Sequence, residues 1–244
     1  MDHPVMSGRE VAYWEEGRAC GEHGLVEWLQ ELKEVARETN RQWSEYLGIP
    51  GSKQLTLVKP SGTVSQLCST SSGIHPRYAD RYLRRVTQDN KDPLTQLMVD
   101  QGVPHVVKGE KTVFTFPIEP PEFSVSRDSM EPLEQLELWL TYRDHWCEGN
   151  PSQTIYYTDE TFLAIQEWVY SHWDKIGGLS FFPASDAMYD KDIVPYLAVN
   201  QEQYEKAVEE FPSRINWDEL SDYETEDTRG TTHEYACSGP SCEL

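Results

Sequence analysis

The stretch TIYYTDETFLAIQEWVYSHWDKIGGLSFF, residues 154–182, decides the fold class of the chain. Its β-branched and aromatic residues at Thr154–Tyr157 predict a strand, and the apolar spacing over Glu160–Asp174 predicts a helix. The Gly-Gly pair that follows ends the helix, and Leu179–Phe182 predicts a second strand. A strand, a helix and a strand in this order indicate α/β organisation with a right-handed crossover.

The chain before this stretch shows the same alternation of elements. Amphipathic spacing predicts long helices, and Asp92 followed by Pro93 is typical of a helix cap and a first helical position. Short apolar and β-branched runs predict strands that are too few for a closed barrel. The predicted helices cover residues 24–47, 93–102 and 129–146, and the predicted strands cover residues 55–58 and 112–116.

The charge of the chain limits the partners that it can have. Its 244 residues carry a formal net charge of −21, which repels nucleic acids and anionic membranes, so we expect neither as a partner. No run approaches the roughly 20 apolar residues that a membrane helix needs. The first residues lack the basic and apolar regions of a secretory signal. We therefore expect a cytoplasmic location.

The five cysteines divide into a pair and three lone residues. Cys237 and Cys242 lie near the end of the chain, and the small, turn-forming residues between them let the two sulfurs approach each other. Such a dithiol on a mobile tail can exchange with disulfides at high effective concentration. Two idle surface cysteines, or a metal site completed by His233, are the alternatives. The lone cysteines, each expected to be a buried thiol, are Cys20, Cys68 and Cys147.

A polar loop after the predicted strand 55–58 carries the other chemical signal. It consists of Pro60, Ser61, Gly62, Thr63, Val64 and Ser65. A strand that turns into a short helix here would expose backbone N–H groups and hydroxyls that bind phosphate, and Gly62 lets the backbone approach a ligand. The second glycine and the lysine of a P-loop are missing. An ordinary helix cap is the alternative.

Four nearby arginines bear on the same question. In this acidic chain, Arg77, Arg81, Arg84 and Arg85 lie within one short segment. They favour an anion site, although arginines in such a segment more often form a solvated face paired with acids.

Longer motifs in a fixed order add a resemblance to these signals. They are VKPSGTVSQL at 58–67, SGIHP at 72–76, DNKDPLT at 89–95, QGVP at 101–104, LEQLELWLTY at 133–142, HWCE at 145–148 and ACSGPSCE at 236–243. Together they resemble the C-terminal region of adenosylcobalamin-dependent class II ribonucleotide reductases, in the branch that uses ribonucleoside triphosphates. The resemblance covers about Gly24 to Leu244.

This resemblance implies a fold and a chemistry. The family has a ten-stranded α/β barrel, of which this chain would supply the C-terminal portion as an incomplete barrel with a flexible acidic tail. In the family, adenosylcobalamin generates a cysteine thiyl radical that removes the ribose 3′-hydrogen, and a cysteine pair supplies the electrons that remove the 2′-hydroxyl. Residues 60–65 would hold the phosphates of the ribonucleoside triphosphate. Cys237 and Cys242 would re-reduce the cysteine pair and be recharged by thioredoxin or a similar reductant.

The resemblance also implies an organisation along the chain. The expected regions are a weakly matched segment at 1–23, the partial barrel at 24–200, a helical or irregular acidic extension at 201–220 and the flexible redox tail at 221–244. Adenosylcobalamin would be shared with an upstream reductase polypeptide, and its contacts are expected within 71–132 and 191–230. Because the radical cysteine of the family lies upstream, we expect activity only when that polypeptide is present. A non-catalytic thiol-exchange or interaction protein derived from the reductase is the alternative.

Overall fold

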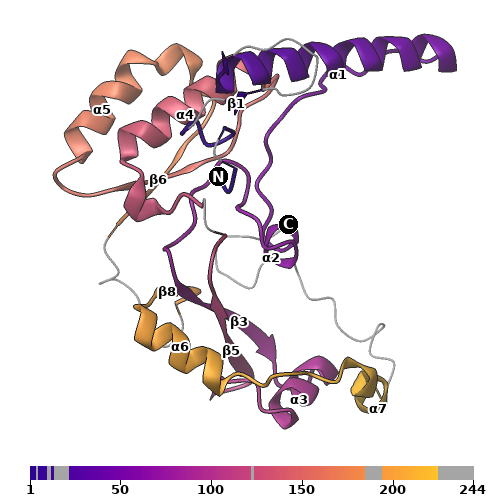
Figure 1. Ribbon diagram of the computed structural model, residues 1–244, viewed down its shortest axis with the longest axis vertical. Coiled ribbons are helices and arrows are strands. Elements are labelled where there is room, and N and C mark those ends of the chain that lie inside the picture. Colours follow the sequence, from indigo (N-terminus) through magenta and orange to yellow (C-terminus); the bar gives the residue numbers. More distant parts are fainter. Residues whose placement is uncertain (4, 10–11, 14–21, 122–123, 185–193, 225–244) are drawn as a thin grey trace. The chain divides into compact units, whose positions relative to one another are not determined.

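The computed structural model describes residues 1–244 except 4, 10–11, 14–21, 122–123, 185–193 and 225–244 (Figure 1). The chain divides into two compact units. Unit 1 comprises Met1–Tyr82 and Ile118–Lys191, and unit 2 comprises Leu83–Pro117 and Asp192–Leu244. Within the described part of the chain, no helix has the length and the apolar character needed to cross a membrane.

Unit 1 contains the strand–helix–strand segment that the sequence predicts. Strands β6 (Thr154–Tyr157) and β7 (Ser180–Pro183) are parallel, with Thr154 opposite Ser180, and helix α5 (Phe162–Ser171) connects them. The α/β prediction is therefore confirmed for this segment. The helix is shorter than expected, because its last predicted turn is a separate 3-10 turn, Trp173–Lys175.

Unit 1 also contains helices and strands from earlier in the chain. They are the antiparallel strands β1 (Ala12–Tyr13) and β2 (Glu22–His23), and helices α1 (Leu25–Leu47), α2 (Val64–Leu67) and α4 (Pro132–His145). Helix α1 ends as the sequence predicts. Gly48 adopts a left-handed conformation with φ 66°, and the amides of Gly48 and Ile49 donate to the carbonyls of Glu45 and Ser44.

The core of unit 1 forms where α1, α4, α5 and β6 meet. Trp139 is completely buried, packs edge-on against Trp168, and donates its indole N–H to the carbonyl of Pro151 at 2.7 Å. Leu29 of α1 and Ile155 of β6 belong to the same buried cluster. Burial of each such side chain stabilises the fold by about 1.5–3 kcal/mol, so this cluster fixes β6 and its neighbours.

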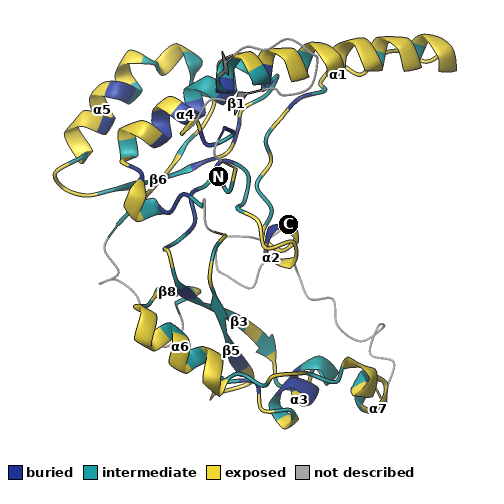
Figure 2. Ribbon diagram, in the orientation of Figure 1, coloured by how far each residue is buried: buried dark blue, intermediate teal, exposed yellow. Residues whose placement is uncertain are grey.

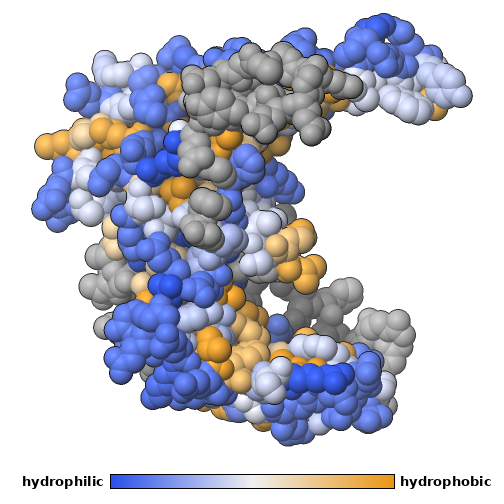
Figure 3. Space-filling view, viewed as in Figure 1, coloured by the Kyte–Doolittle hydropathy of each residue, from blue (hydrophilic) through white to orange (hydrophobic). Residues whose placement is uncertain are grey.

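Only the first half of α1 takes part in that core. Leu25 and Leu29 are buried, but the apolar stripe continues along the same face with exposed residues (Figure 2). The exposed members are Leu32, Val35, Trp43, Tyr46 and Leu47, with Tyr46 81% exposed. The space-filling view shows hydrophilic residues along the upper side of this free end (Figure 3). Ion pairs along this helix join Glu34 to Arg37, Glu38 to Arg41, and Arg41 to Glu45.

Unit 2 is built on a four-stranded sheet with the order β4-β5-β3-β8. Its strands are β3 (Tyr82–Asp89), β4 (His105–Lys108), β5 (Lys111–Ile118) and β8 (Tyr196–Ala198). Strands β4 and β5 are antiparallel, with His105 opposite Phe114. Phe114, Met98 and Val103 form its small buried core.

The helices of unit 2 are fixed by caps and polar contacts. Helix α3 (Pro93–Asp100) begins as predicted, with Asp92 accepting a hydrogen bond from the amide of Leu94. The acidic extension contains α6 (Gln201–Glu210), capped by Asn200, and α7 (Leu220–Tyr223) begins at its last residue and continues into the first residues of the expected tail. The Tyr223 hydroxyl donates to Asp100 of α3 at 3.0 Å, so the first residues of the segment expected as the tail are attached to α3.

The structure corrects two expectations about strands. Residues 55–58 are extended but form no strand, because no strand runs beside them in the described part of the chain. Strand β3, in contrast, occupies the arginine-rich segment for which the sequence predicted none. The fold is mixed α/β, and none of the three sheets closes into a barrel among the described residues.

Candidate substrate-phosphate loop

The extended segment that leads into the loop is attached to the residues that follow α4. The amide of Glu148 donates to the carbonyl of Thr56 at 2.9 Å, and the Thr56 hydroxyl donates to the carbonyl of Trp146. The Leu55 amide, which donates to the Glu148 carboxylate at 2.7 Å, lowers the pKa of Glu148 below its usual value, and Arg37 lowers it further. These contacts fix residues 55–58, and they replace the hydrogen bonds that a neighbouring strand would make.

Hydrogen bonds inside the loop bring the two serines of residues 60–65 together. The Ser65 amide donates to the Ser61 hydroxyl at 2.8 Å, and the Ser65 hydroxyl donates to the Ser61 carbonyl at 2.9 Å. Ser65 is 4% exposed. The expected short helix is present as α2, but its four residues generate only a small dipole. The predicted helix cap therefore exists, and it uses Ser61 and Ser65.

Three consecutive amides of the loop remain open. Among the described residues, no protein group accepts a hydrogen bond from the amides of Gly62, Thr63 and Val64. All three residues are exposed. A Cβ atom at Gly62 would meet no atom within 4 Å, so the glycine leaves free space above the backbone. Lys59 is exposed beside them, with no carboxylate partner in the described part of the chain. The arrangement offers donors and one cation to an anion.

The segment after the loop folds back onto it. The Ser61 amide donates to the Ser72 hydroxyl at 2.9 Å, and this hydroxyl donates to the Ser61 carbonyl at 2.9 Å. Gly73 has φ +59°, and a Cβ atom there would lie 3.1 Å from the Val58 side chain. His75 then bonds to the backbone of Thr154 in β6. Residues 72–76 form one of the motifs that carry the resemblance and lie within the expected cofactor region 71–132, but no contact with the loop was predicted for them.

A buried ion pair supports this segment from the other side. Asp2 accepts hydrogen bonds from Arg77 at 2.7 and 3.0 Å, from the Ser124 hydroxyl and from the Ser71 amide. Although burial raises the pKa of Asp2, the bonds from Arg77 and Ser124 outweigh it and the pKa lies below its usual value. The Met1 ammonium donates to the Ser71 hydroxyl at 2.9 Å. This cluster fixes the chain just before residues 72–75.

The arginine segment does not supply a free anion site. Arg77 is paired with Asp2, Arg81 with Glu119 at 2.8 Å, and Arg84 lies over the ring of Tyr196. The interpretation as residues paired with acids is therefore confirmed for Arg77 and Arg81. Arg77 is buried, however, and so is not part of a solvated face.

Several predicted sites lie outside the described residues. These are the dithiol Cys237 and Cys242, with His233, the lone Cys20, and parts of both expected cofactor regions, 71–132 and 191–230. In the described part of the chain, no group of three His, Cys, Asp or Glu residues could hold a metal ion.

The two lone cysteines that are described differ from each other. Cys147 is buried as expected, and burial raises the pKa of its thiol. The expectation for Cys68 is wrong: its side chain is exposed, because it follows the short helix α2 on the outside of the loop.

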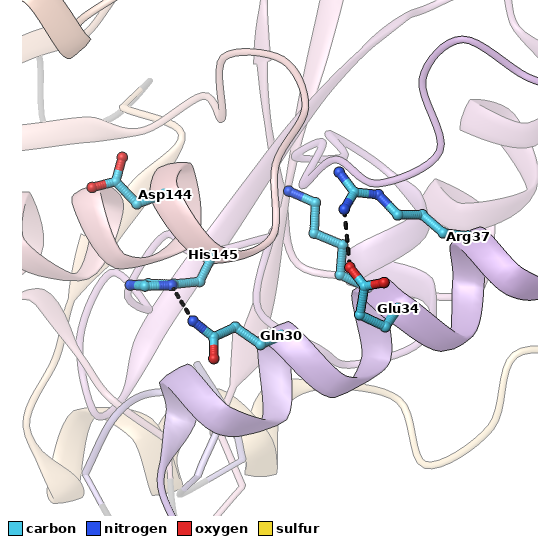
Figure 4. Close-up of a pocket in the computed structure, with 6 residues that line it drawn as sticks. Gln30, Glu34, Arg37, Asp144 and His145 are labelled. Atoms are coloured by element: carbon cyan, nitrogen blue, oxygen red, sulfur yellow. Dashed lines mark hydrogen bonds and ion pairs between the residues drawn. The ribbon is translucent and has the colours of Figure 1, made fainter.

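A cleft of about 380 Å³ lies between α1 and α4. The Gln30 amide contacts the ring of His145 at 3.0 Å, and Arg37 is paired with Glu34 (Figure 4). Asp144 is paired with Lys175. Because Gln30 bonds to His145 and Glu34 to Arg37, these contacts use four of the lining side chains, and the Gln30–His145 contact joins α1 to α4. Its lining residues are Gln30, Lys33, Glu34, Arg37, Asp144 and His145.

Comparison with known proteins identifies relatives of the whole described fold. No protein-family model matches the chain. An adenosylcobalamin-dependent ribonucleoside-triphosphate reductase of Euglena gracilis is 30% identical over 197 residues, which cover 77% of this chain and 26% of the relative. A probable enzyme of the same name from Dictyostelium discoideum is 26% identical over the same shares. The Lactobacillus acidophilus reductase is 23% identical, covering 100% of this chain and 34% of its own length.

A solved structure shares the fold. It is a B12-dependent class II ribonucleotide reductase, with a TM-score of 0.70 and 20% identity, and the match covers 87% of this chain and 31% of that one. The chain thus spans about a quarter of the length of the first two relatives. On these matches, the chain is homologous to adenosylcobalamin-dependent class II ribonucleotide reductases over a partial region of those enzymes.

Proposed function

We propose that this chain is the C-terminal part of a ribonucleotide reductase that converts ribonucleoside triphosphates to 2′-deoxyribonucleotides. The observation that carries the proposal is the row of open amides at Gly62, Thr63 and Val64, in a chain whose relatives are named ribonucleoside-triphosphate reductases. Consecutive backbone N–H groups in a turn bind phosphate oxygens well. The loop would orient the triphosphate so that its ribose meets the radical chemistry of the rest of the enzyme.

The terminal thiols would supply the electrons. In this proposal, Cys237 attacks the disulfide that each turnover leaves in the active site and releases one thiol, and Cys242 then attacks the Cys237 sulfur of the mixed disulfide and releases the second. Two electrons and two protons pass to the active-site pair, and the tail becomes a disulfide. Thioredoxin or a similar dithiol reductant returns it to the thiol state by the same exchange.

Adenosylcobalamin would supply the radical initiation, but the cleft between α1 and α4 does not fit it. The cleft between α1 and α4 has about 380 Å³ and is lined by polar and charged side chains, of which Glu34 and Arg37 are paired with each other. Its volume is near the lower limit even for drug-sized ligands, and a corrin is larger. The remaining part of the reductase would provide most of its site.

The exposed stripe of α1 supports the need for that remaining part. Leu32, Val35, Trp43, Tyr46 and Leu47 continue the face that is buried at Leu25 and Leu29. A contiguous exposed apolar face of this kind is typical of an interface. An upstream reductase polypeptide, which would carry the radical cysteine, is the proposed occupant.

Reconstitution tests the proposal. The 244-residue chain is mixed with a reductase from which the matched region has been deleted, together with adenosylcobalamin, thioredoxin and a ribonucleoside triphosphate. We expect deoxyribonucleotide to form only in the complete mixture. Cys237→Ser with Cys242→Ser should limit the mixture to a single turnover with thioredoxin and leave turnover with a small dithiol. An assembled complex that forms no deoxyribonucleotide would contradict the proposal.

A non-catalytic thiol-exchange protein derived from the reductase is the competing outcome. It would exchange disulfides with thioredoxin in the absence of cobalamin. A titration of adenosylcobalamin, monitored by its absorbance with and without the remaining part of the reductase, distinguishes the two functions. Only the reductase proposal expects the absorbance to change in the assembled complex.

A further inference from the structure

The side chain of His75 joins the segment after the loop to strand β6. The amide of Thr154 donates to His75 Nε2 at 3.0 Å, and His75 Nδ1 lies 3.0 Å from the carbonyl of Ser72. An amide can only donate and a carbonyl can only accept, so the two partners fix the protonation of the ring. The imidazole is neutral, with its proton on Nδ1.

Ser72 connects His75 to the loop through hydrogen bonds. Its carbonyl accepts from both the His75 ring and the His75 amide, while its hydroxyl makes the two bonds to the backbone of Ser61. Ser61 in turn caps the amide of Ser65. A continuous series of hydrogen bonds therefore runs from Thr154 in β6 to the first turn of α2, directly under the open amides.

Packing supports the same connection. Ile74 is 2% exposed and belongs to the core of unit 1, and its carbonyl accepts from the side-chain amide of the buried Gln153 at 3.3 Å. The left-handed Gly73 lies against Val58 and Pro60, where a Cβ atom would be only 3.1 and 3.5 Å from their nearest atoms. Residues 72–75 thus fit closely between the loop and β6.

We propose that His75 is a positioning residue: its neutral Nδ1–H form holds residues 60–65 against β6 through Ser72, so that the amides of Gly62, Thr63 and Val64 stay aligned for an anion. The proposal rests on the proposed function only for what the loop binds. Protonation of Nε2 would place its N–H against the Thr154 N–H, which breaks the attachment. The loop should then lose its order.

The electrostatic surroundings agree with a neutral ring. Burial lowers the pKa of His75 below its usual 6.5, and the Ser72 carbonyl opposes this in part. The charged groups of the adjoining segments are the Met1 ammonium, Asp2 and Arg77, which bond to one another or to Ser71. On β6 the titratable groups are Tyr156 and Tyr157. Among the described residues, no hydrogen bond or ion pair joins any of these groups to the ring.

The first test uses the full chain without any ligand. Two-bond nitrogen–proton NMR of the imidazole should identify the Nδ1–H form at neutral pH. The protection of the Ser61 and Ser65 amides from hydrogen exchange should fall about tenfold as His75 is protonated, because one or two hydrogen bonds are lost. In His75→Phe that pH dependence should vanish and protection should stay low.

Two variants separate positioning from general stability. His75→Gln, whose terminal amide can replace Nε2, should restore part of the protection. His172→Phe is the matched control, since His172 also bonds a backbone carbonyl through Nδ1, that of Trp168, away from the loop; it should leave the protection unchanged. If His75→Phe does not fold, Ser72→Ala replaces it in the comparison. An Nε2–H tautomer would overturn the proposal, and so would hydrogen-exchange protection of the Ser61 and Ser65 amides that does not change as His75 titrates.

The second test adds an anion. Tripolyphosphate should bind the wild-type chain about tenfold more tightly than Ser72→Ala or His75→Phe, and equally to His172→Phe. If tripolyphosphate does not bind the wild type but exchange still depends on His75, then the phosphate role of the loop fails while the positioning role stands. If it binds all variants equally, the positioning role fails.

Discussion

Asp2 and Arg77 form the pair on which the segment after the loop depends most. Their side chains are 15% and 4% exposed, and the carboxylate has four donors around it. Removing one member of a buried pair leaves the other charge uncompensated, which costs about 3–5 kcal/mol. We therefore expect Asp2→Asn to lower the free energy of unfolding by roughly that amount in urea denaturation. Asp128→Asn, which changes an exposed carboxylate 3.7 Å from Arg127, is the control and should cost less than about 1 kcal/mol.

The environments of single tyrosines and cysteines depend on contacts that a local sequence pattern does not specify. The tyrosine pair Tyr156–Tyr157 is used in aromatic packing, with Tyr156 edge-on to Phe182 and Tyr157 against Phe162. Cys68 and Cys147 look alike in the sequence, yet one is exposed and the other buried. The difference arises from which neighbours cover each thiol, and no local pattern encodes those neighbours.

At the scale of elements, the loop and α2 allow a test of the open amides. Val64 is the first residue of α2, where proline fits a helix and removes only an amide that has no partner. Val64→Pro should therefore weaken tripolyphosphate binding by up to about tenfold while the melting temperature changes little. Gln201→Pro, at the first position of α6, is the matched control. Unchanged affinity in Val64→Pro would argue against binding by these amides.

Helix α1 gives a second prediction at this scale. Trp43 is 59% exposed, so Trp43→Glu should change the stability of the isolated chain by less than about 0.5 kcal/mol. The same change should abolish or strongly weaken co-elution with the remaining part of the reductase, because it places a charge in the apolar stripe. Gln42→Glu adds the same charge beside the stripe and should leave co-elution intact. If the chain associates with itself and Trp43→Glu abolishes that association, the occupant of the stripe is a second copy of the chain.

The stability of the whole molecule at low pH depends on carboxyl groups whose pKa values are lowered in the folded chain. The pKa values of Asp2 and Glu148 lie below their usual 3.8 and 4.5. A carboxylate whose pKa is depressed by folding contributes stability above its usual pKa and loses it as the pH falls through the folded value. The melting temperature should therefore decline as the pH is lowered from about 4.5 towards 3. Asp2→Asn should flatten the part of this decline below pH 3.8. A profile that is identical for both proteins would contradict the assignment.

The sequence by itself determined those features that depend on short-range forces. The apolar spacing of α1, the Asp92 cap of α3, and the individual elements β6, α5 and β7 are each set by residues within a few positions of one another. The composition of residues 60–65 likewise indicated a serine-capped turn with spare amides, and the structure contains one. Local backbone preferences and side-chain periodicity suffice for such features.

Only the tertiary structure decided which distant groups meet. Residues 55–58 have the composition of a strand, but the Leu55 amide and the Thr56 hydroxyl donate instead to Glu148 and Trp146, some 90 positions later in the chain. His75 finds its second partner at Thr154, and Asp2 finds Arg77. The exposed half of α1 has the same apolar spacing as the buried half. The physical reason is common to all of these: a hydrogen bond or buried contact between remote segments depends on where the whole chain packs, and periodicity contains no information about that.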